Sequence, residues 1–280
     1  MSDVPTLYKY MPFRKEFFDN FYLRCTPRSA LNDPFELSPS SQYMFDHTTD
    51  TLGQLELEEG LNEGFEWNQK MLEIAFTKLG IISFSETRDN LLMWSHYADN
   101  HRGIVIEFDP THIFFNDDPI ASKKLGRVAY RKERLKSIPY QWDGIFTKSD
   151  STRIYFEKAD EWIYEKEYRL ICDLYASNDT LCSTEYYDEK LRHKYPNCNP
   201  EPATKEMVSL KGIQNSCHDA SDPSVLCMLE VPKDCIRSIT CGALIAPKDK
   251  EYVKAKAAEF NFVFLETQID DNEYRLNFLG

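Results

Sequence analysis

The sequence predicts an α+β protein, and three observations support this class. Short runs rich in β-branched and aromatic residues recur along the whole chain. The helical patterns between them do not alternate regularly with the strands, as they would in a doubly wound sheet. No internal repeat or interdomain linker is visible. We therefore expect a single domain over residues 1–280, with two excursions at about 37–65 and 176–223.

In the first part of the chain, the clearest strand patterns alternate apolar and polar residues or concentrate β-branched ones. The predicted strands are 6–10, 21–26, 81–85, 103–108 and 127–130. Helical spacing of apolar residues predicts helices at 13–21, 65–79 and 89–99, with Gly80 as C-cap of the second and Asp89 or Asn90 as N-cap of the third. Between them, residues 30–36 form a turn around Pro34.

The second part of the chain continues in the same mixed fashion. The predicted helices are 148–163 and 247–259, and the predicted strands are 167–172, 225–231, 235–245, 262–266 and an edge strand at 273–278. The polar segment 176–223 is expected to be an inserted loop region or a small helical excursion, because it is too long for a simple connection.

The composition indicates a folded protein. Hydrophobic residues make up 42% and charged residues 28% of the chain, which is enough apolar material for a core. The net charge of −13 opposes a general attraction to nucleic acid or to anionic membranes, although a small basic cleft can still act locally. Only 10 glycines are present, so a glycine-rich phosphate loop is not expected.

We expect a cytoplasmic protein that does not enter a membrane. No run of 18 apolar residues exists, and the first residues do not have the pattern of a secretory signal. Without a secretory signal, the eight cysteines are expected to be reduced thiols, and since none forms a C-x-x-C pair, no metal is expected. A zinc alternative would use His193, Cys198, Cys217 and His218, but this spacing fits no compact zinc module.

Two groups of polar residues allow both a structural and a functional reading. Asn32-Asp33-Pro34-Phe35-Glu36 is either a turn followed by a surface acid or a rigid turn that holds amide and carboxylate groups at a cleft. Later in the chain, Trp94, Tyr97 and His101 share one helical face and His96 points away. That face is either core or a binding surface, since each of these side chains has polar atoms that need partners when buried.

A third group lies at the start of the predicted strand 167–172. In an extended strand, Glu165, Glu167 and Arg169 point to one face. One reading is a solvated face with ion pairs. The other is a carboxylate that holds a ribose hydroxyl and stabilises an oxocarbenium-like transition state. The motifs of Rossmann dehydrogenases, P-loop enzymes, zincins and α/β-hydrolases are absent from the sequence.

The order of these motifs resembles a large bacterial family that is catalogued only as a domain of unknown function. The motifs are Leu7–Tyr10, Leu31–Glu36, Phe84–Glu86, Met93–Ala98 with His101 and Gly103, Trp162, Tyr164–Arg169, and a final strand at Ile236–Gly242. Their layout is similar to that of the ADP-ribosyltransferase superfamily. This resemblance implies a split β-sandwich, in which two small, mostly antiparallel sheets are flanked by helices.

The resemblance also implies NAD as the substrate and a dissociative reaction, in which nicotinamide leaves and an acceptor captures the oxocarbenium ion. Glu167 would be the catalytic acid that holds the ribose 2′-hydroxyl, with Glu165 as its upstream partner. The implied NAD-binding residues are Lys9, Tyr10, Thr26, Asn32, Asp33, Ser85, Trp94, His96, Tyr97 and Arg169. Among these, Trp94 or Tyr97 (or Tyr168 beside them) would stack on nicotinamide, and Arg169 or Lys9 would meet the pyrophosphate.

Such a transferase would be a bacterial toxin or an anti-phage defence effector, restrained by an antitoxin or another regulatory protein. Its acceptor would be a protein or a nucleic acid, RNA or DNA. Two other classes stay open: a sensor module that binds a nucleotide or nucleic acid without turnover, and a nuclease or other hydrolase. The hydrolase would hold Mg²⁺ with Asp33, Glu36, Glu86, Glu165 and Glu167.

Overall fold

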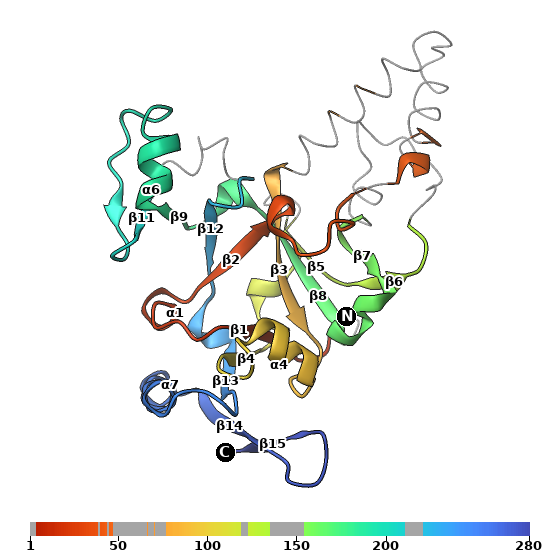
Figure 1. The fold of residues 1–280 in the computed structure, drawn as a ribbon, viewed down its shortest axis with the longest axis vertical. Coiled ribbons are helices and arrows are strands. Elements are labelled where there is room, and N and C mark those ends of the chain that lie inside the picture. The colour runs from red at the N-terminus through yellow and green to blue at the C-terminus, as the bar shows by residue number, and fades with distance from the viewer. Residues whose placement is uncertain are drawn as a thin grey trace.

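The computed structural model describes residues 4–38, 40–43, 45–46, 66, 70, 77–118, 123–134, 154–210 and 221–280. The fold mixes α and β elements and is dominated by one large sheet (Figure 1). Most of the predicted helix at 65–79 and most of the excursion at 37–65 lie outside the described residues; residues 66, 70, 77 and 78 are helical, and β3 begins at Leu79. Within them, no helix is long and apolar enough to cross a membrane.

Hydrogen bonds join thirteen strands into the large sheet. These strands are β1 (Leu7–Met11), β2 (Tyr22–Pro27), β3 (Leu79–Ser85), β4 (Ile104–Phe108), β5 (Lys124–Arg127), β8 (Glu167–Asp173), β9 (Asp179–Ser183), β10 (Glu201–Pro202), β11 (Met207–Ser209), β12 (Leu226–Glu230), β13 (Ile236–Cys241), β14 (Val263–Ile269) and β15 (Leu276–Leu279). The pairs are antiparallel apart from β13 with β14. Two further strands, β6 (Ala129–Arg131) and β7 (Glu157–Ala159), form a separate parallel pair.

The large sheet branches at β3. One edge of β3 pairs along its whole length with β8, which pairs in turn with β5. The opposite edge is shared: Thr26 of β2 faces Ile81 near the start of β3, and Tyr8 of β1 faces Ser85 at its end. From there β2 leads to β12, β9, β11 and β10, whereas β1 leads to β4, β13, β14 and β15. The two branches diverge clearly from β3 (Figure 1).

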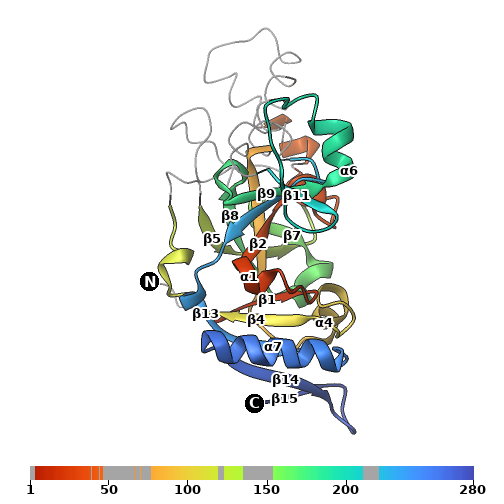
Figure 2. The ribbon, with the colours of Figure 1, turned by 90° about the vertical axis from the view of Figure 1, so that its left-hand side faces the viewer.

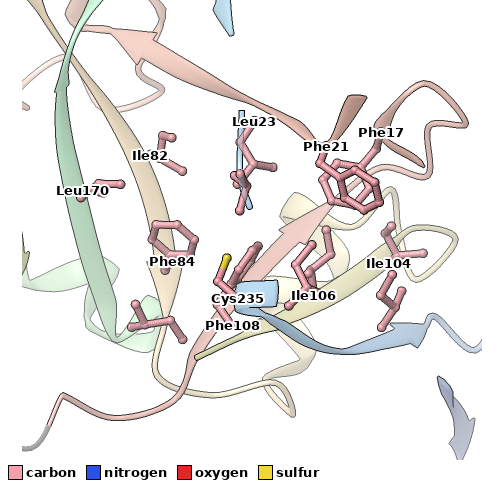
Figure 3. Packing of buried hydrophobic residues seen from close by; sticks show 14 of the residues in the cluster. Phe17, Phe21, Leu23, Ile82, Phe84, Ile104, Ile106, Phe108, Leu170 and Cys235 are labelled. Carbon is pink, nitrogen blue, oxygen red and sulfur yellow. The ribbon is translucent and has the colours of Figure 1, made fainter. Parts of the chain in front are cut away.

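The main hydrophobic core is built from both branches. Figure 3 shows Leu23 of β2, Phe84 of β3, Phe108 of β4 and Leu170 of β8 pointing toward one another. The rings of Phe84 and Phe108 meet edge to face with their centroids 5.4 Å apart, a favourable geometry for aromatic pairs. Because this core draws on strands from either side of β3, it fixes the angle at which the branches part.

The helices that are described from end to end are α1 (Phe17–Asn20), α4 (Leu91–Tyr97), α6 (Thr184–Tyr186) and α7 (Pro247–Phe260). The side chain of Asn90 caps α4 by accepting hydrogen bonds from the backbone N–H groups of Leu92 and Met93, as the sequence predicts. Helix α7 carries proline in its first turn and ends at Asn261 in the left-handed conformation. It lies along β13 and β14 (Figure 2).

Most of the predicted strands are confirmed, as are α4 and α7. Of the predicted helix at 148–163, the structure describes residues from 154 on: residues 154–155 are helical, but the prediction is wrong beyond them, where β7 follows and η3 (Asp160–Glu165) is a 3₁₀ helix. The reason is tertiary, because β7 pairs with β6, a contact that local helical spacing does not reveal. Gly80 is not a helix cap either; it lies within β3, opposite Cys172.

The expected sheet arrangement needs a correction. The pairing is mostly antiparallel as predicted, but the two expected small sheets are joined into one, because β2 pairs with β3 at Thr26 and Pro27. The described part of the excursion at 176–223 is not an irregular loop. It adds β9, β11 and β10 to the sheet and packs Cys182, Leu191 and Val208 into a cluster of its own.

Candidate functional site

A small cavity of about 80 Å³ lies where β1, β3 and β8 run side by side. Tyr8 of β1 faces Ser85 of β3, which faces Glu167 of β8. These three residues therefore lie in one row across three neighbouring strands. Lys9 lines the same cavity from β1, and Tyr97 lines it from the last turn of α4.

The wall of this cavity is a buried cluster of five charged residues. Its members are Glu36, Lys158, Glu165, Glu167 and Arg169, all of them buried. They come from the turn after β2, from β7, from the end of η3 and from β8. We call them the charge cluster. Three carboxylates and two cations give it one formal negative charge.

Arg169 organises one side of the charge cluster. Its side chain is 0% exposed. The guanidinium Nε donates to Glu167 Oε1 at 2.9 Å, Nη2 donates to Glu36 Oε2 at 2.5 Å, and Nη1 donates to the backbone oxygen of Tyr155 at 2.7 Å. Such charge-assisted bonds hold both carboxylates in fixed orientations.

Lys158 organises the other side. Its ammonium nitrogen lies 2.6 Å from Glu165 Oε2, 2.9 Å from Glu36 Oε1 and 3.4 Å from Glu167 Oε2. Burial by itself would lower the pKa of this ammonium, but the three carboxylates raise it. Lys158 therefore stays charged and occupies the point at which the three carboxylates converge.

The backbone at the start of β8 aims both glutamates into the cluster. Lys166, between them, adopts a left-handed conformation with φ 44°, so β8 begins only at Glu167. The carbonyl of Glu165 accepts a hydrogen bond from the Ser85 hydroxyl at 2.7 Å, and the N–H of Glu167 donates to the Tyr130 hydroxyl at 2.7 Å. The alternation of a regular strand does not extend to Glu165, but its side chain still reaches the same cavity.

The two glutamates have different electrostatic environments. Burial raises the pKa of Glu167, but Arg169 and Lys158 outweigh this effect and lower it to about 2. At Glu165 burial prevails over the attraction of Lys158, and the charge of Glu167 adds to it, so its pKa is raised. Glu167 is therefore the acid that stays ionised at neutral pH, whereas Glu165 holds a proton more readily.

A hydrogen-bonded chain connects Glu165 to the turn after β2. The Tyr97 hydroxyl donates to Glu165 Oε1 and accepts from Asn32 Nδ2, the latter at 3.0 Å. Burial, and then the charge of Glu165, raises the pKa of Tyr97. The phenol therefore remains protonated and acts as a donor to Glu165.

Lys9 contributes a second amine to the cavity. Its Nζ donates to the backbone oxygen of Ser83 at 2.9 Å. Burial lowers its pKa to about 8, although the charge of Glu167 works in the opposite direction. The Lys9 ammonium therefore loses its proton in the neutral to mildly alkaline range of pH, below the range of an ordinary lysine.

The structure brings most of the predicted site residues together. Lys9, Tyr10, Asn32, Ser85, Tyr97, Glu165 and Glu167 line the small cavity, and Arg169 lies behind it in the charge cluster. The Tyr10 hydroxyl donates to the backbone oxygen of Thr87 at 2.9 Å, so only part of this side chain is available to a ligand. Asp33 lines a larger neighbouring cavity instead.

Three predicted site residues lie elsewhere. Trp94 is fully buried, its indole N–H donates to the backbone oxygen of Arg88 at 2.7 Å, and its ring stacks on His101. His96 is exposed on the outer side of α4, as its spacing predicts. Thr26 belongs to the junction of β2 with β3 and does not line the cavity.

Sequence reasoning missed Lys158 and undervalued Glu36. Glu36 was placed at a cleft only as an alternative or as a metal ligand, and Lys158 fell within the helix predicted at 148–163. The five-carboxylate magnesium arrangement is not assembled: Glu86 pairs with Arg127 at 2.6 Å, and Lys158 lies among the remaining acids. In the described part of the chain, no group of three His, Cys, Asp or Glu residues could hold a metal; Cys217 and His218 lie outside it.

Comparison with known proteins gives one finding. Residues 93–170 match a family model described as a protein of unknown function, DUF2971. No curated protein matches the chain, and no solved structure does. The matched segment contains Tyr97, Lys158, Glu165, Glu167 and Arg169, which are most of the charge cluster and its hydrogen-bonded neighbour. The expected link to a family of unknown function is therefore confirmed for this segment.

Proposed function

We propose that the protein is an NAD-dependent ADP-ribosyltransferase, whose fold is the split β-sandwich of that superfamily with its two sheets joined at the pairing of β2 with β3. The observation that carries the proposal is the row Tyr8, Ser85 and Glu167 across β1, β3 and β8. In the superfamily, a first strand supplies a polar residue, a second a hydroxyl and a late strand the catalytic glutamate. Here the strand between the first and the late one is β3, so Ser85 takes the hydroxyl position rather than Thr26.

The electrostatics of Glu167 support its role as the catalytic residue. The reaction breaks the bond between C1′ of the ribose and nicotinamide, which leaves as a neutral molecule with the bonding electrons. Glu167 holds the ribose 2′-hydroxyl and stabilises the positive charge that develops on the sugar. This role requires an ionised carboxylate, and the lowered pKa of about 2 supplies one.

The other residues of the cavity then have defined tasks. Glu165, whose pKa is raised, takes the proton of the attacking acceptor. Tyr97 orients Glu165 through its hydroxyl, and its ring forms part of the wall against which nicotinamide lies. The cavity is small, at about 80 Å³, so it receives the nicotinamide end of NAD while the rest of the dinucleotide lies outside.

This activity implies a biological setting. NAD is an intracellular metabolite, so the proposal places the enzyme in the cytoplasm. Uncontrolled transfer there would damage the cell itself, which fits a toxin or an anti-phage effector restrained by an antitoxin or another regulatory protein. The acceptor would be a protein or a nucleic acid.

Release of nicotinamide from NAD tests the proposal. The parent protein is expected to release it, and Glu167→Gln to release it at least about 100-fold more slowly, as when one transition-state contact is removed. Glu86→Gln is the matched control, because Glu86 lies one residue beyond β3 and pairs with Arg127 outside the cavity. A Glu167→Gln protein that keeps the parental rate would refute the central role of Glu167.

A second variant distinguishes the loss of a catalytic contact from the loss of the folded structure. Replacing Glu167 disrupts a buried ion pair, so Tyr97→Phe is measured beside it; this change removes one hydroxyl and leaves every charge in place. We expect a slower rate of nicotinamide release from a protein whose circular dichroism spectrum at the assay temperature matches that of the parent. Equal rates in Tyr97→Phe and the parent would remove Tyr97 from the mechanism.

One observation favours the second candidate, a sensor that binds a nucleotide without turnover. Both carboxylate oxygens of Glu167 are already engaged by Arg169 and Lys158, and the residue is only 3% exposed. A sensor would show a higher melting temperature with NAD and no free nicotinamide. That combination, measured in the same samples, would decide against the transferase.

A further inference from the structure

A second and larger cavity, of about 270 Å³, adjoins the small one. The turn after β2 and the pair β6–β7 line it, and these segments lie at the same side of the molecule (Figure 1). Glu36 and Lys158 line both cavities. A molecule bound in the larger cavity would therefore rest against the charge cluster, next to the place where the proposed reaction occurs.

The rim of this larger cavity combines exposed cations with an exposed aromatic ring. Phe35 is 61% exposed, and the guanidinium of Arg134 lies 5.6 Å from its ring centroid. Arg131 and Lys132 are exposed beside it. Arg131 already pairs with Glu157 at 3.0 Å, whereas Lys132 has no ion pair with any residue that the structure describes. Glu133 and Glu161 line the same cavity, so its rim carries charges of both signs, with Lys132 as an exposed cation that has no carboxylate partner among the described residues.

An unsatisfied acceptor lies in the wall of the same cavity. Asp33 is 4% exposed, and its Oδ1 accepts a hydrogen bond from the N–H of Phe35 at 2.9 Å. Its Oδ2 is buried and has no hydrogen-bond partner in the part of the chain that the structure describes. A buried carboxylate oxygen without a donor is costly, and a ligand that brings an N–H group would remove this cost.

We propose that the larger cavity binds a base of single-stranded nucleic acid and that this base is the acceptor of the ADP-ribosyl group. The inference rests on the transferase function proposed above. Phe35 stacks on the base, Lys132 lies beside the backbone phosphate, and Asp33 Oδ2 accepts from the exocyclic amino group of the base. Cytosine, adenine and guanine carry such a group, whereas uracil and thymine do not.

The transfer step balances without a further reagent. The bond between C1′ and nicotinamide breaks, and its electron pair leaves with nicotinamide. A lone pair on a nitrogen of the base forms the new bond to C1′. The proton of that nitrogen passes to the carboxylate of Glu165. The products are the ADP-ribosylated base and nicotinamide.

Binding of labelled single-stranded oligocytidine and oligouridine, followed by fluorescence anisotropy without NAD, tests the cavity independently of catalysis. We expect tighter binding of oligocytidine. Phe35→Ala should weaken binding of both probes about fivefold or more, because a base loses its stacking partner. Lys132→Ala should lower the slope of log affinity against log salt concentration by about 0.7, the contribution of one phosphate contact on a single strand.

Asp33→Asn is the sharpest variant. It keeps the oxygen that accepts from Phe35 N–H, but an amide NH₂ can replace the unpaired oxygen. The preference for oligocytidine should therefore disappear or reverse toward oligouridine, while the fold is retained. Ile113→Ala and Lys248→Ala are matched controls, since they remove an exposed apolar side chain and an exposed cation far from the cavity; both should bind as the parent does.

The outcomes separate this inference from the proposed function. No oligonucleotide binding, or variants of the cavity that bind like the parent, would overturn the inference even if NAD is cleaved. Transfer of labelled ADP-ribose to protein, unaffected by Phe35→Ala, would overturn it in favour of a protein acceptor. Binding that responds to the variants as expected, but without any cleavage of NAD, would support the nucleic-acid site and refute the transferase.

Discussion

Two glutamates two residues apart in the chain have opposite electrostatic characters. Glu167 shares Arg169 and Lys158, and its pKa falls to about 2. Glu165 is held by Lys158 and by the neutral hydroxyl of Tyr97, and its pKa is raised. The number of cations within hydrogen-bonding distance therefore decides which carboxylate stays ionised. This separation is typical of sites in which one acid carries charge and the other moves a proton.

The lowered pKa of Glu167 predicts a specific dependence of stability on pH. The ordinary pKa is 4.5 and the folded one about 2, so the ionised form stabilises the folded state fully above pH 4.5. This contribution is lost as the pH falls from 4.5 toward 2. For Glu165, whose pKa is raised, the effect on stability has the opposite sign: its contribution is present below pH 4.5 and is lost as the pH rises through the raised pKa.

Urea unfolding at several pH values between 7 and 3 measures the effect. The free energy of unfolding of the parent should fall steeply below pH 4.5. In Glu167→Gln the free energy of unfolding should fall less steeply over this range. This variant should also be about 3–5 kcal/mol less stable than the parent at pH 7, because a buried cation has lost its partner. Glu86→Gln should keep the parental slope. The same slope in Glu167→Gln as in the parent would contradict the assignment.

At the scale of elements, the site depends on one hydrogen-bonded chain between segments that share no strand pairing. Asn32 follows β2, Tyr97 ends α4 and Glu165 ends η3, and the Tyr97 hydroxyl joins all three. Helix α4 ends there because Asp99, Asn100 and His101 follow with positive φ values. The end of one helix thus sets the position of the carboxylate on another element.

Tyr97→Phe should therefore lower the free energy of unfolding more than Asn32→Ala does. The Phe variant leaves a buried oxygen of Glu165 without its donor, at about 1–3 kcal/mol, whereas Asn32 is exposed and its loss should stay within about 1 kcal/mol. A double-mutant cycle by urea unfolding should show coupling between the two changes, since Asn32 acts through the same hydroxyl. Strictly additive values would show that the chain does not act as a unit.

The elements that the sequence predicted well are those whose pattern is local. Strands β3, β4 and β8 carry runs of β-branched and aromatic residues, and the cap at Asn90 is visible in the sequence. The role of Lys158 could not be predicted from the sequence, since this residue lies in the three-residue strand β7, which forms only because it pairs with β6. Glu165 and Glu167 were correctly expected to face one cleft, but the left-handed Lys166 between them could not be read from alternation.

At the scale of the whole molecule, the branch of the sheet at β3 is a feature that no local sequence pattern predicts. Gly80 lies at this branch, between Pro27 of β2 and Cys172 of β8. A Cβ atom there would come within 2.6 Å of Leu174 Cδ2, 2.7 Å of Cys25 Sγ and 3.1 Å of the backbone oxygen of Thr26. Glycine is thus required by the close approach of β2 and of Leu174, which directly follows β8, rather than by the helix cap that its sequence position suggests.

Gly80→Ala should consequently destabilise the protein without touching the site. The added methyl group must displace packed side chains, at a cost of about 1–3 kcal/mol in urea unfolding. The cavity lies near Ser85 at the other end of β3, so the folded variant should bind NAD with parental affinity in calorimetry. Gly280→Ala is the control, because the contact below 3 Å there is with the flexible tip of Leu265, and its stability should match the parent. A Gly80→Ala protein as stable as the parent would show that the branch can accommodate a methyl group, against the prediction. A folded Gly80→Ala protein with a lower affinity for NAD would show that the branch and the site are coupled through β3.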